Sequence, residues 1–486
     1  MIDVCMVLEG TYPYVAGGVS TWVHQLVSSM KDIRFGIIYI APNSDPTRTL
    51  KYELPPQVLM MKEIYLHDYD LERRGKRPPR PGDYNLLKQY YQKILKGDCD
   101  GLDPLLSLFH GNNSCLDLKT LFSSKEVWDL LTFFYNEIGQ AVSFLDFFWT
   151  WRGTHLPLFQ TLQAEIPKAK IYHAVSTGYA GLVASMGKIL HRGLFFLTEH
   201  GIYSHERLLE ISQAHWIYEQ EKGRFRAERD LSFFKQWWLG MFQVMSRLAY
   251  LHADKIVTLF EGNKVRQILE GAPSEKISII SNGIDLKDYL SIQREKKKIP
   301  QVGLVGRVVG IKDIRTFIQA AKRILSTGQE MQFYIIGPTD EEEEYFEECR
   351  AMVDELKLET HITFTGQVDV KDYYRFLDLI VLTSRSEAQP YVILEANSVG
   401  IPVVATNVGA CREMLEGGDP EDKRIGPSGL ITEVSNPEST AAAILKPVRE
   451  PELYRAMSEA GKKRVAAYYN QDDLLGKYLN LYEQNL

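Results

Sequence analysis

The chain has 486 residues, 45% of them hydrophobic and 24% charged, and a formal net charge of −7. This length predicts two domains, and the composition is ordinary for a soluble globular protein. The negative charge disfavours nucleic acid or anionic lipid as the main partner, because both favour a basic surface, but it is compatible with a local basic site for a phosphorylated ligand.

Cysteine usage and hydropathy indicate the compartment. The cysteines are far apart, odd in number and form no CxxC, which is typical of reduced thiols in a cytosolic protein rather than of a disulfide or zinc framework; they are Cys5, Cys99, Cys115, Cys349 and Cys411. The opening "MIDVCMVLEG" lacks the basic start of a secretion signal. No apolar stretch reaches the roughly 18 to 20 residues of a membrane span, so we expect a cytoplasmic protein.

Short apolar, β-branched runs alternate with helix-like segments along the chain. The first half contains "IDVCMVL", "RFGIIYI", "KIYHAV", "LFFLT", "DKIVTLF" and "KISII"; the second contains "PQVGLVG", "MQFYIIG", "HITFTG", "DLIVLTS", "IPVVAT" and "GLIT". Continuous apolar runs that alternate with helices are typical of parallel sheets buried on both faces. The two series predict an α/β protein with two doubly wound, Rossmann-like domains.

The charged stretch "SIQREKKKIP", residues 291–300, predicts the boundary between these domains and is interpreted as a solvated linker, with a functional basic patch as the lesser alternative. We therefore expect an N-terminal domain at 1–290 and a C-terminal domain at 291–468. The amphipathic segment 469–486 is expected to pack back on the first domain.

Residues from about 63 to 167 interrupt the first series with polar, helix-like sequence that becomes strongly aromatic in "LLTFFYNEIGQAVSFLDFFWTW". We interpret this stretch as a helical insertion whose aromatic residues pack on the core. The alternative is a docking surface for a partner or membrane. The stretch "FFKQWWLGMFQVMSRLAYL" also has two interpretations. It is either a core helix or a contact for the acceptor or for membrane partners.

Two stretches of the first domain could approach a ligand. In "EGTYPYVAGGVSTWV", Gly17 and Gly18 lie between the first strand and a helix, where glycine permits close backbone approach, although the pattern is not GxGxxG. In "FFLTEHGIYSHER", His200 follows a strand and would face the crevice where α/β proteins bind ligands. A plain turn and a core histidine are the alternatives.

In the second domain, "VGLVGRVVGIKD" ends a strand at Gly306 and supplies Arg307 and Lys312. Two cations beside a close-approach glycine can neutralise a diphosphate as charge moves onto it. A solvated basic loop is the alternative.

The stretch "SEAQPYVILEA" brackets a helix start with two carboxylates, Glu387 and Glu395. Pro390 suits the first helical turn, which would leave the backbone N–H groups of the next three residues, Tyr391, Val392 and Ile393, as donors for a phosphate. Glu395 could accept from ribose hydroxyls and Glu387 from a sugar. The pattern thus suits a nucleotide diphosphate that carries a sugar, unless the two glutamates are a cap and a surface residue.

Taken in chain order, these stretches resemble the retaining glycosyltransferases of family 4, which have the GT-B fold of two Rossmann-like domains. The resemblance is carried by "SNGID" at 281–285, Arg307 with Lys312, "FTGQV" at 364–368 and the E-x7-E pair Glu387/Glu395. Within that family, "LEGTYPYVAGGVSTWVHQL", "LTEHGIYSHER" and the insertion are similar to the PelF group, cytosolic enzymes of bacterial Pel exopolysaccharide synthesis.

The resemblance implies a role for each matching residue. Arg307 and Lys312 would bind the donor diphosphate, with the backbone of Gly17, Gly18 and Gly306 close to it; Glu395 would hold the ribose and Glu387 the donor sugar. Gly366, Gln367 and Val368 would meet the uracil through their backbone, and His200 would face the sugar. Family members often have glycine at the position of Ala388, so the resemblance leaves the shape of the donor-sugar pocket open.

The function implied is hexosyl transfer with retention from a UDP-sugar, either UDP-glucose or a UDP-hexosamine, to a growing exopolysaccharide of Pel type, without a metal or other cofactor. Inner-membrane Pel synthase proteins would be the partners and could recruit the chain to the inner face of the cytoplasmic membrane. The alternatives are a catalytically silent UDP-binding subunit of a membrane synthase and a UDP-sugar epimerase or hydrolase.

Two acidic triplets imitate the DxD metal motif of another transferase fold, "DYD" at 68–70 and "DCD" at 98–100. We interpret both as polar loops, because neither follows a recognisable apolar strand. The sequence "DCDGLD" also lacks the calcium-loop spacing, which places glycine at the sixth position.

Overall fold

The structure, a computed structural model, describes residues 1–137, 142–213 and 232–486. The chain divides into two compact units. The first comprises Met1–Thr258, Lys264–Ser278 and Leu479–Leu486, and the second comprises Leu259–Asn263 and Ile279–Tyr478. The main break thus follows Ser278, whereas the sequence suggested residue 290, and the chain returns to the first unit at Leu479.

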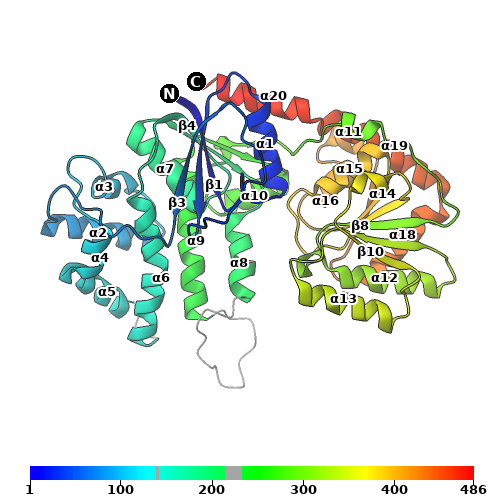
Figure 1. Ribbon diagram of the computed structural model, residues 1–486, viewed down its shortest axis with the longest axis horizontal. Coiled ribbons are helices and arrows are strands. Elements are labelled where there is room, and N and C mark those ends of the chain that lie inside the picture. Colours follow the sequence, from blue (N-terminus) through cyan, green and yellow to red (C-terminus); the bar gives the residue numbers. More distant parts are fainter. Residues whose placement is uncertain (138–141, 214–231) are drawn as a thin grey trace. The chain divides into compact units, whose positions relative to one another are not determined.

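A seven-stranded sheet forms the centre of the first unit, in the order β3-β2-β1-β4-β5-β6-β7 (Figure 1). Its strands are β1 (Ile2–Glu9), β2 (Phe35–Ala41), β3 (Val58–Tyr65), β4 (Ala169–Ala174), β5 (Leu194–Glu199), β6 (Lys255–Thr258) and β7 (Ile277–Ile279). The pairings from β3 to β6 are parallel. Every strand except β3 lies in a predicted apolar run. The sequence missed β3 because Lys62 and Glu63 interrupt the apolar pattern of this half-buried strand.

The helices of the first unit follow the strands in chain order. They are α1 (Gly18–Ser29), α2 (Pro81–Leu95), α3 (Leu102–Ser107), α4 (Leu118–Ser123), α5 (Lys125–Glu137), α6 (Phe144–Leu162), α7 (Tyr179–His191), α8 (Tyr203–Gln213), α9 (Phe233–His252) and α10 (Glu261–Leu269), which begins in the second unit, with a short 3-10 helix at Ser274–Lys276.

Helices α2 to α6 lie between β3 and β4 and correspond to the expected insertion, of which residues 138–141 lie outside the described part. Its aromatic residues divide into two groups. Phe134, Phe147, Trp151 and Phe159 belong to the hydrophobic core that also includes the sheet of this unit. On the surface, Trp128, Leu145 and Trp149 are 49%, 62% and 57% exposed. The insertion therefore has both a core face and an apolar outer face.

Helix α9, the aromatic segment "FFKQWWLGMFQVMSRLAYL", is a core helix. It buries Phe234, Leu239, Phe242 and Met245 and runs alongside α7 and α8. Trp237 and Trp238 pack partly buried against the same core. The interpretation of this segment as a core helix therefore accounts for its buried face.

The end of the chain packs on the sheet of the first unit. Tyr482 is fully buried, its ring stacks on Phe196, and its hydroxyl pairs with Nδ1 of His173. Nε2 of His173 pairs in turn with Thr198 on β5 at 2.8 Å. Burial lowers the pKa of His173 to about 3, so this imidazole is neutral at physiological pH.

A six-stranded sheet forms the second unit, in the order β10-β9-β8-β11-β12-β13. All of its pairings are parallel. The strands are β8 (Gln301–Val305), β9 (Gln332–Ile336), β10 (Ile362–Gly366), β11 (Leu379–Leu382), β12 (Val403–Thr406) and β13 (Gly429–Thr432). Each lies in a predicted run, and this order is that of a Rossmann fold. The expected pair of Rossmann-like sheets is confirmed.

The second unit contains α11 (Lys287–Leu290), a 3-10 helix at Gly310–Lys312, α12 (Ile314–Ser326), α13 (Glu343–Glu355), α14 (Val370–Tyr374), α15 (Tyr391–Val399), α16 (Cys411–Glu416), α17 (Pro420–Lys423), α18 (Pro437–Arg449), α19 (Pro451–Tyr468) and α20 (Gln471–Glu483), which ends in the first unit. Among the helices of the described residues, none is long and apolar enough to cross a membrane.

The charged stretch 291–300 is mostly solvent-exposed and makes side-chain contacts with the second unit. The guanidinium of Arg294 donates to the carbonyl of Tyr374, and the ammonium of Lys297 lies 5.5 Å from the ring centre of Phe376. Residues 293–298 are all exposed, and the Lys297 side chain is about half exposed, which agrees with the interpretation of this stretch as solvated.

Candidate functional site

The second unit places two predicted motifs at one point of its sheet. The strand order reverses between β8 and β11, and parallel α/β sheets bind ligands beyond the carboxyl ends of the strands at such a point. Gly306 follows β8, and the stretch from Ser386 follows β11. Backbone and side-chain bonds join the two loops. The Arg385 amide donates to the Ile311 carbonyl at 2.8 Å, and the Thr383 hydroxyl lies 2.9 Å from the carbonyl of Lys312.

Lys312 and Glu387 form an ion pair across these loops. Nζ of Lys312 lies 2.6 Å from Oε1 of Glu387, and the side chains are only 20% and 12% exposed. The Ser384 hydroxyl also donates to Oε1 at 2.6 Å. One carboxylate oxygen of Glu387 is thus occupied, where the sequence suggested a free carboxylate. The other, Oε2, has no hydrogen-bond partner within the described part of the chain.

Glycine is required beside this pair. Gly306 has a φ of +154°, and a Cβ there would lie 3.4 Å from Cε of Lys312. Beneath Glu387, Gly409 has a φ of +52°, and a Cβ there would lie 2.1 Å from the Glu387 carbonyl oxygen. The sequence analysis did not identify Gly409, although its place directly after "VVATNV" and β12 was a usable signal. Gly409 therefore permits a close approach of the backbone to Glu387, whereas Gly306 is favoured by its positive φ alone.

Arg307 has a different partner from Lys312. Its guanidinium is 54% exposed and lies 2.6 Å from Oε2 of Glu341, in the loop after β9. The adjacent Glu342 accepts from the amide of Gly310 at 2.8 Å. Arg307 is therefore the more accessible of the two cations, held at the surface by an ion pair that an anionic ligand can replace.

Helix α15 begins at Tyr391, and Pro390 is the residue before its first turn. The amide of Ile393 donates to the Pro390 carbonyl at 3.2 Å, so the expectation of three available donors is wrong for Ile393. Tyr391 and Val392 remain the amides of the first turn. The side chain of Gln389 accepts from the Asn282 amide at 2.6 Å, which ties "SNGID" to the helix start.

Glu395 lies one turn into α15 and is largely buried. The Tyr374 hydroxyl donates to its Oε2 at 2.6 Å. Burial raises the pKa of Glu395, while hydrogen bonds from Tyr374 and Tyr289 act in the opposite direction. One oxygen of Glu395 is therefore fixed by a buried phenol, which the sequence analysis did not foresee because Tyr374 lies on a separate helix.

The expected uracil loop follows β10. Gly366 has a φ of +67°, and its carbonyl accepts from the Gly337 amide at 3.2 Å. Gln367 and Val368 are exposed beyond it, with Val368 at 38%. The loop thus presents exposed backbone after a strand that pairs with β9.

In the first unit, Gly17 precedes α1 and Gly18 is its first residue. The imidazole of His200 packs edge-on against Trp22 of α1, with ring centres 4.7 Å apart. Burial lowers the pKa of His200 to about 4, so the ring is neutral. The structure therefore brings His200 to the helix that Gly18 opens.

Two carboxylates in the first unit, the buried Glu199 and the partly buried Glu9, escaped the sequence analysis as site residues. Glu199 accepts from the hydroxyl of Tyr250 at 2.7 Å, the amide of Tyr203 at 3.0 Å and the side chain of Gln267 at 2.9 Å. Burial raises the pKa of Glu199 to about 7. Glu9 accepts from the Tyr203 hydroxyl at 2.9 Å, and burial raises its pKa as well. The sequence contained a signal that could have identified both residues, because each is a glutamate at the carboxyl end of an apolar strand.

The acidic triplets accept hydrogen bonds from loop amides, and in "DCD" the carboxylate of Asp98 accepts from the Asp100 amide at 2.9 Å. Strand β3 ends at Tyr65, so the premise that no strand precedes "DYD" is wrong. Asp68 nevertheless accepts from the Ser44 amide at 2.9 Å, and Asp70 from the Glu72 and Arg73 amides, both at 3.1 Å. In the described parts of the chain, no group of three or more His, Cys, Asp or Glu side chains is arranged to hold a metal ion.

Comparison with protein families identifies both halves of the chain. The model of a family described as "Domain of unknown function (DUF3492)" matches residues 2–275, more than half of the chain. The model "Glycosyl transferases group 1" matches residues 287–464. The second domain, which carries the Lys312–Glu387 pair, is therefore a glycosyltransferase group 1 domain.

Curated relatives match about half of the chain. N-acetyl-alpha-D-glucosaminyl L-malate synthase of Bacillus anthracis is 24% identical over 240 residues, which cover 49% of this chain and 59% of the relative. The capsular polysaccharide biosynthesis glycosyltransferase CapM of Staphylococcus aureus is 24% identical over 241 residues, 46% of this chain and 59% of the relative. The chain thus spans about three-fifths of the length of these relatives.

Solved structures are similar over the whole chain. Sucrose-phosphate synthase (tll1590) of Thermosynechococcus elongatus has a TM-score of 0.58 and 17% identity, and covers 99% of this chain and 98% of its own. Anabaena HepE in complex with UDP has a TM-score of 0.60 and 13% identity, and covers 99% and 100%. At such low identities, the structural similarity concerns the fold alone. It confirms the GT-B fold, with its two Rossmann-like domains.

Proposed function

The chain belongs to the family described as "Domain of unknown function (DUF3492)", and we propose that it is a retaining, family 4-type glycosyltransferase of the PelF group. It transfers a hexose from a UDP-sugar, either UDP-glucose or a UDP-hexosamine, to a growing exopolysaccharide of Pel type. The glycosyltransferase group 1 domain at residues 287–464 supports the transferase class.

The Lys312–Glu387 pair carries this proposal. It is a charged pair that is mostly buried, and it lies at the reversal point of a Rossmann sheet, beside the start of α15. A buried pair costs desolvation energy and is weak evidence of stabilisation. Its position therefore favours a ligand role, in which Lys312 moves from Glu387 to a donor phosphate and Glu387 accepts from a sugar hydroxyl.

The donor is proposed to bind around this pair. Lys312, the accessible Arg307 and the first amides of α15 contact the diphosphate, since cations and helix N-termini both attract phosphate. Glu395 accepts from ribose hydroxyls, and the backbone of residues 366–368 meets the uracil. The UDP named in the HepE complex supports a nucleotide donor of this kind.

The proposed reaction breaks the bond between C1 of the donor sugar and the diphosphate oxygen, and forms a bond from C1 to the acceptor hydroxyl oxygen on the same face. The acceptor proton passes to the departing diphosphate oxygen, and UDP leaves. Lys312 and Arg307 stabilise the negative charge that develops on the diphosphate. Because these cations and the helix amides can supply that stabilisation, we propose that no metal ion or other cofactor takes part.

The outer face of the insertion supports a proposal about partners and location. Trp128, Leu145 and Trp149 present exposed apolar surface on α5 and α6. Exposed tryptophan is typical of contacts with a partner or a membrane interface. We propose that this face meets inner-membrane Pel synthase proteins and brings a cytoplasmic enzyme to the inner face of that membrane.

A transfer assay tests this function. The purified protein is incubated with labelled UDP-glucose, UDP-N-acetylglucosamine or UDP-N-acetylgalactosamine and oligosaccharide acceptors, and NMR identifies the anomer of the new bond. We expect product with the donor's α configuration and none from Glu387→Gln. Conversion of the donor without acceptor indicates an epimerase or hydrolase instead, and UDP binding without any turnover indicates a silent subunit.

A further inference from the structure

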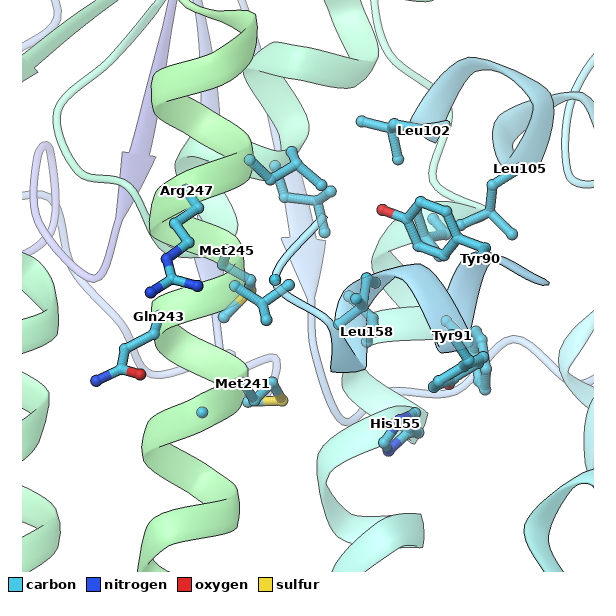
Figure 2. Close-up of a pocket in the computed structure, with 18 of the residues that line it drawn as sticks. Tyr90, Tyr91, Leu102, Leu105, His155, Leu158, Met241, Gln243, Met245 and Arg247 are labelled. Atoms are coloured by element: carbon cyan, nitrogen blue, oxygen red, sulfur yellow. The ribbon is translucent and has the colours of Figure 1, made fainter. Parts of the chain in front are cut away.

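A cavity of about 380 Å³ lies inside the first unit, among helices α2, α3, α6, α7 and α9 (Figure 2). Its lining residues all fall between Leu87 and Leu248. None of them is a residue that we assign to the donor, the ribose or the transferred sugar. The cavity is therefore a second candidate site, separate from the proposed transferase chemistry.

The interior of the cavity is apolar. Leu105, Leu158, Met241 and Val244 line it together with the ring of Trp237. In Figure 2, Met241 and Met245 point from α9 toward Leu158 on α6 and the tyrosines of α2. An apolar cavity of about 150 Å³ holds a benzene molecule, and known ligand pockets begin at about 300 Å³. The space therefore suits an extended hydrocarbon group.

The polar groups in the wall remain uncharged. His155 stacks between Trp151 and Tyr91, with ring centres 4.6 Å and 5.3 Å away, and its Nδ1 lies 2.8 Å from the Trp151 carbonyl oxygen. Burial lowers the pKa of His155 to about 4. The Tyr91 hydroxyl is buried without a hydrogen-bond partner among the described residues. A charged ligand group would thus find no counter-ion inside.

The rim of the cavity is polar and carries a positive charge. Gln236, Gln243 and Arg247 also line the cavity and are exposed. Their spacing of seven and four residues places them on one face of α9. Within the described part of the chain, Arg247 forms no hydrogen bond or ion pair. The nearby Asp98 is engaged by Lys93 at 3.7 Å. An exposed guanidinium without an ion pair of its own therefore lies at the rim of the apolar cavity, and the carboxylates of Asp98 and Asp100 are close by.

We propose that this cavity binds the alkyl chain of an anionic amphiphile, with the chain among the helices and a carboxylate or phosphate head at Arg247. Apolar walls take the chain because burial of each CH₂ group is favourable. A guanidinium is the side chain best suited to pair with a carboxylate or phosphate. The site is independent of the proposed transferase activity.

Tryptophan fluorescence tests the proposal with the full chain. Trp237 lines the cavity, so the bromine of ω-bromoundecanoate, used as the probe, should quench its emission. The quenching should largely disappear in Trp237→Phe. Leu158→Trp, which fills the space, should abolish binding of the probe, measured by calorimetry, while an unchanged circular dichroism spectrum shows that the variant is folded.

The charge at the rim is tested separately. Arg247→Gln should weaken ω-bromoundecanoate about five- to tenfold and leave the neutral ω-bromoundecanol within about twofold. The matched control, Arg350→Gln, removes an exposed arginine from the second unit and should change neither affinity. Vesicles of phosphatidylglycerol with brominated acyl chains identify the source: quenching by them supports bilayer lipid, and quenching by the monomer alone supports a free amphiphile.

Three results would overturn the proposal. They are no quenching by the acid, quenching that persists fully in Trp237→Phe, and an equal loss of affinity for acid and alcohol in Arg247→Gln. Measurement of UDP binding on the same samples keeps this outcome separate from that of the proposed function, because no donor-site residue is altered.

Discussion

The ammonium of Lys312 lies 2.6 Å from the carboxylate of Glu387, although the two residues come from loops after different strands of the second sheet. The two loops are joined by a hydrogen bond from the Arg385 amide to the Ile311 carbonyl at 2.8 Å, and Gly409 permits a close approach of the backbone to Glu387. The protein thus holds a cation and an acceptor of hydrogen bonds together at the point where Rossmann sheets bind ligands.

Loss of Lys312 should abolish most of the transferase activity. Lys312→Ala removes the cation that we assign to the departing diphosphate, so we expect kcat/KM to fall by about 10²- to 10³-fold. Initial rates with the preferred UDP-sugar measure the effect. Arg350→Ala, which removes an exposed arginine, should retain full activity. Unchanged turnover in Lys312→Ala would reject the assigned role.

Tyr374 should contribute to recognition of ribose through Glu395. In Tyr374→Phe, Glu395 loses the phenol that fixes its Oε2, and we expect UDP to bind about three- to tenfold more weakly. The affinity for 2′-deoxy-UDP should change less, because it lacks one of the ribose hydroxyls. Calorimetry gives both constants, and Tyr373→Phe is the control. If Tyr374→Phe left the ratio of the dissociation constants of UDP and 2′-deoxy-UDP unaltered, that would argue against Glu395 as the ribose acceptor.

Gly409→Ala should destabilise the second unit. The new Cβ would lie 2.1 Å from the Glu387 carbonyl oxygen at a φ of +52°, so we expect a loss of more than about 2 kcal/mol in the free energy of unfolding. Gly426 provides a matched control, since its φ is +90° but no atom lies within 4 Å of an added Cβ. Gly426→Ala should cost only about 1 to 2 kcal/mol. Equal costs in urea denaturation would show that the close approach at Gly409 is unimportant.

Stability should depend on pH through Glu199. Its folded pKa of about 7 exceeds the ordinary value of 4.5, so the folded state binds more protons than the unfolded state between these values. The free energy of unfolding should therefore fall as pH rises from about 4.5 to above 7, by roughly 3 kcal/mol from this group. Glu199→Gln should lack this contribution. Parallel pH curves for the two proteins would contradict it.

The strands of both sheets were predictable because a strand buried on both faces is a continuous apolar run. Strand β3 was not, since it is half exposed and carries Lys62 and Glu63. The insertion was predicted as helical from its composition, but its division into a core face with Trp151 and an outer face with Trp149 depends on packing.

The candidate site was predictable at the level of motifs. Glycine, lysine and glutamate at the ends of strands marked Gly306, Lys312 and Glu387. The partners of these side chains were not predictable, because the ion pair of Arg307 with Glu341 and the contact of Tyr374 with Glu395 join segments that are distant in the sequence. The apolar cavity was hidden for the same reason, since α2, α3, α6, α7 and α9 all contribute to it.

Calorimetry with UDP, ADP and GDP tests the central claim most directly. The account predicts that UDP binds, that one UDP-hexose binds more tightly, and that Lys312→Ala and Arg307→Ala weaken both. Binding of ADP in place of UDP would retain a nucleotide-sugar site but contradict the UDP donor and the Pel-type assignment. If none of the three nucleotides bound to the wild-type chain, the proposed donor site at Lys312 and Glu387 would be wrong.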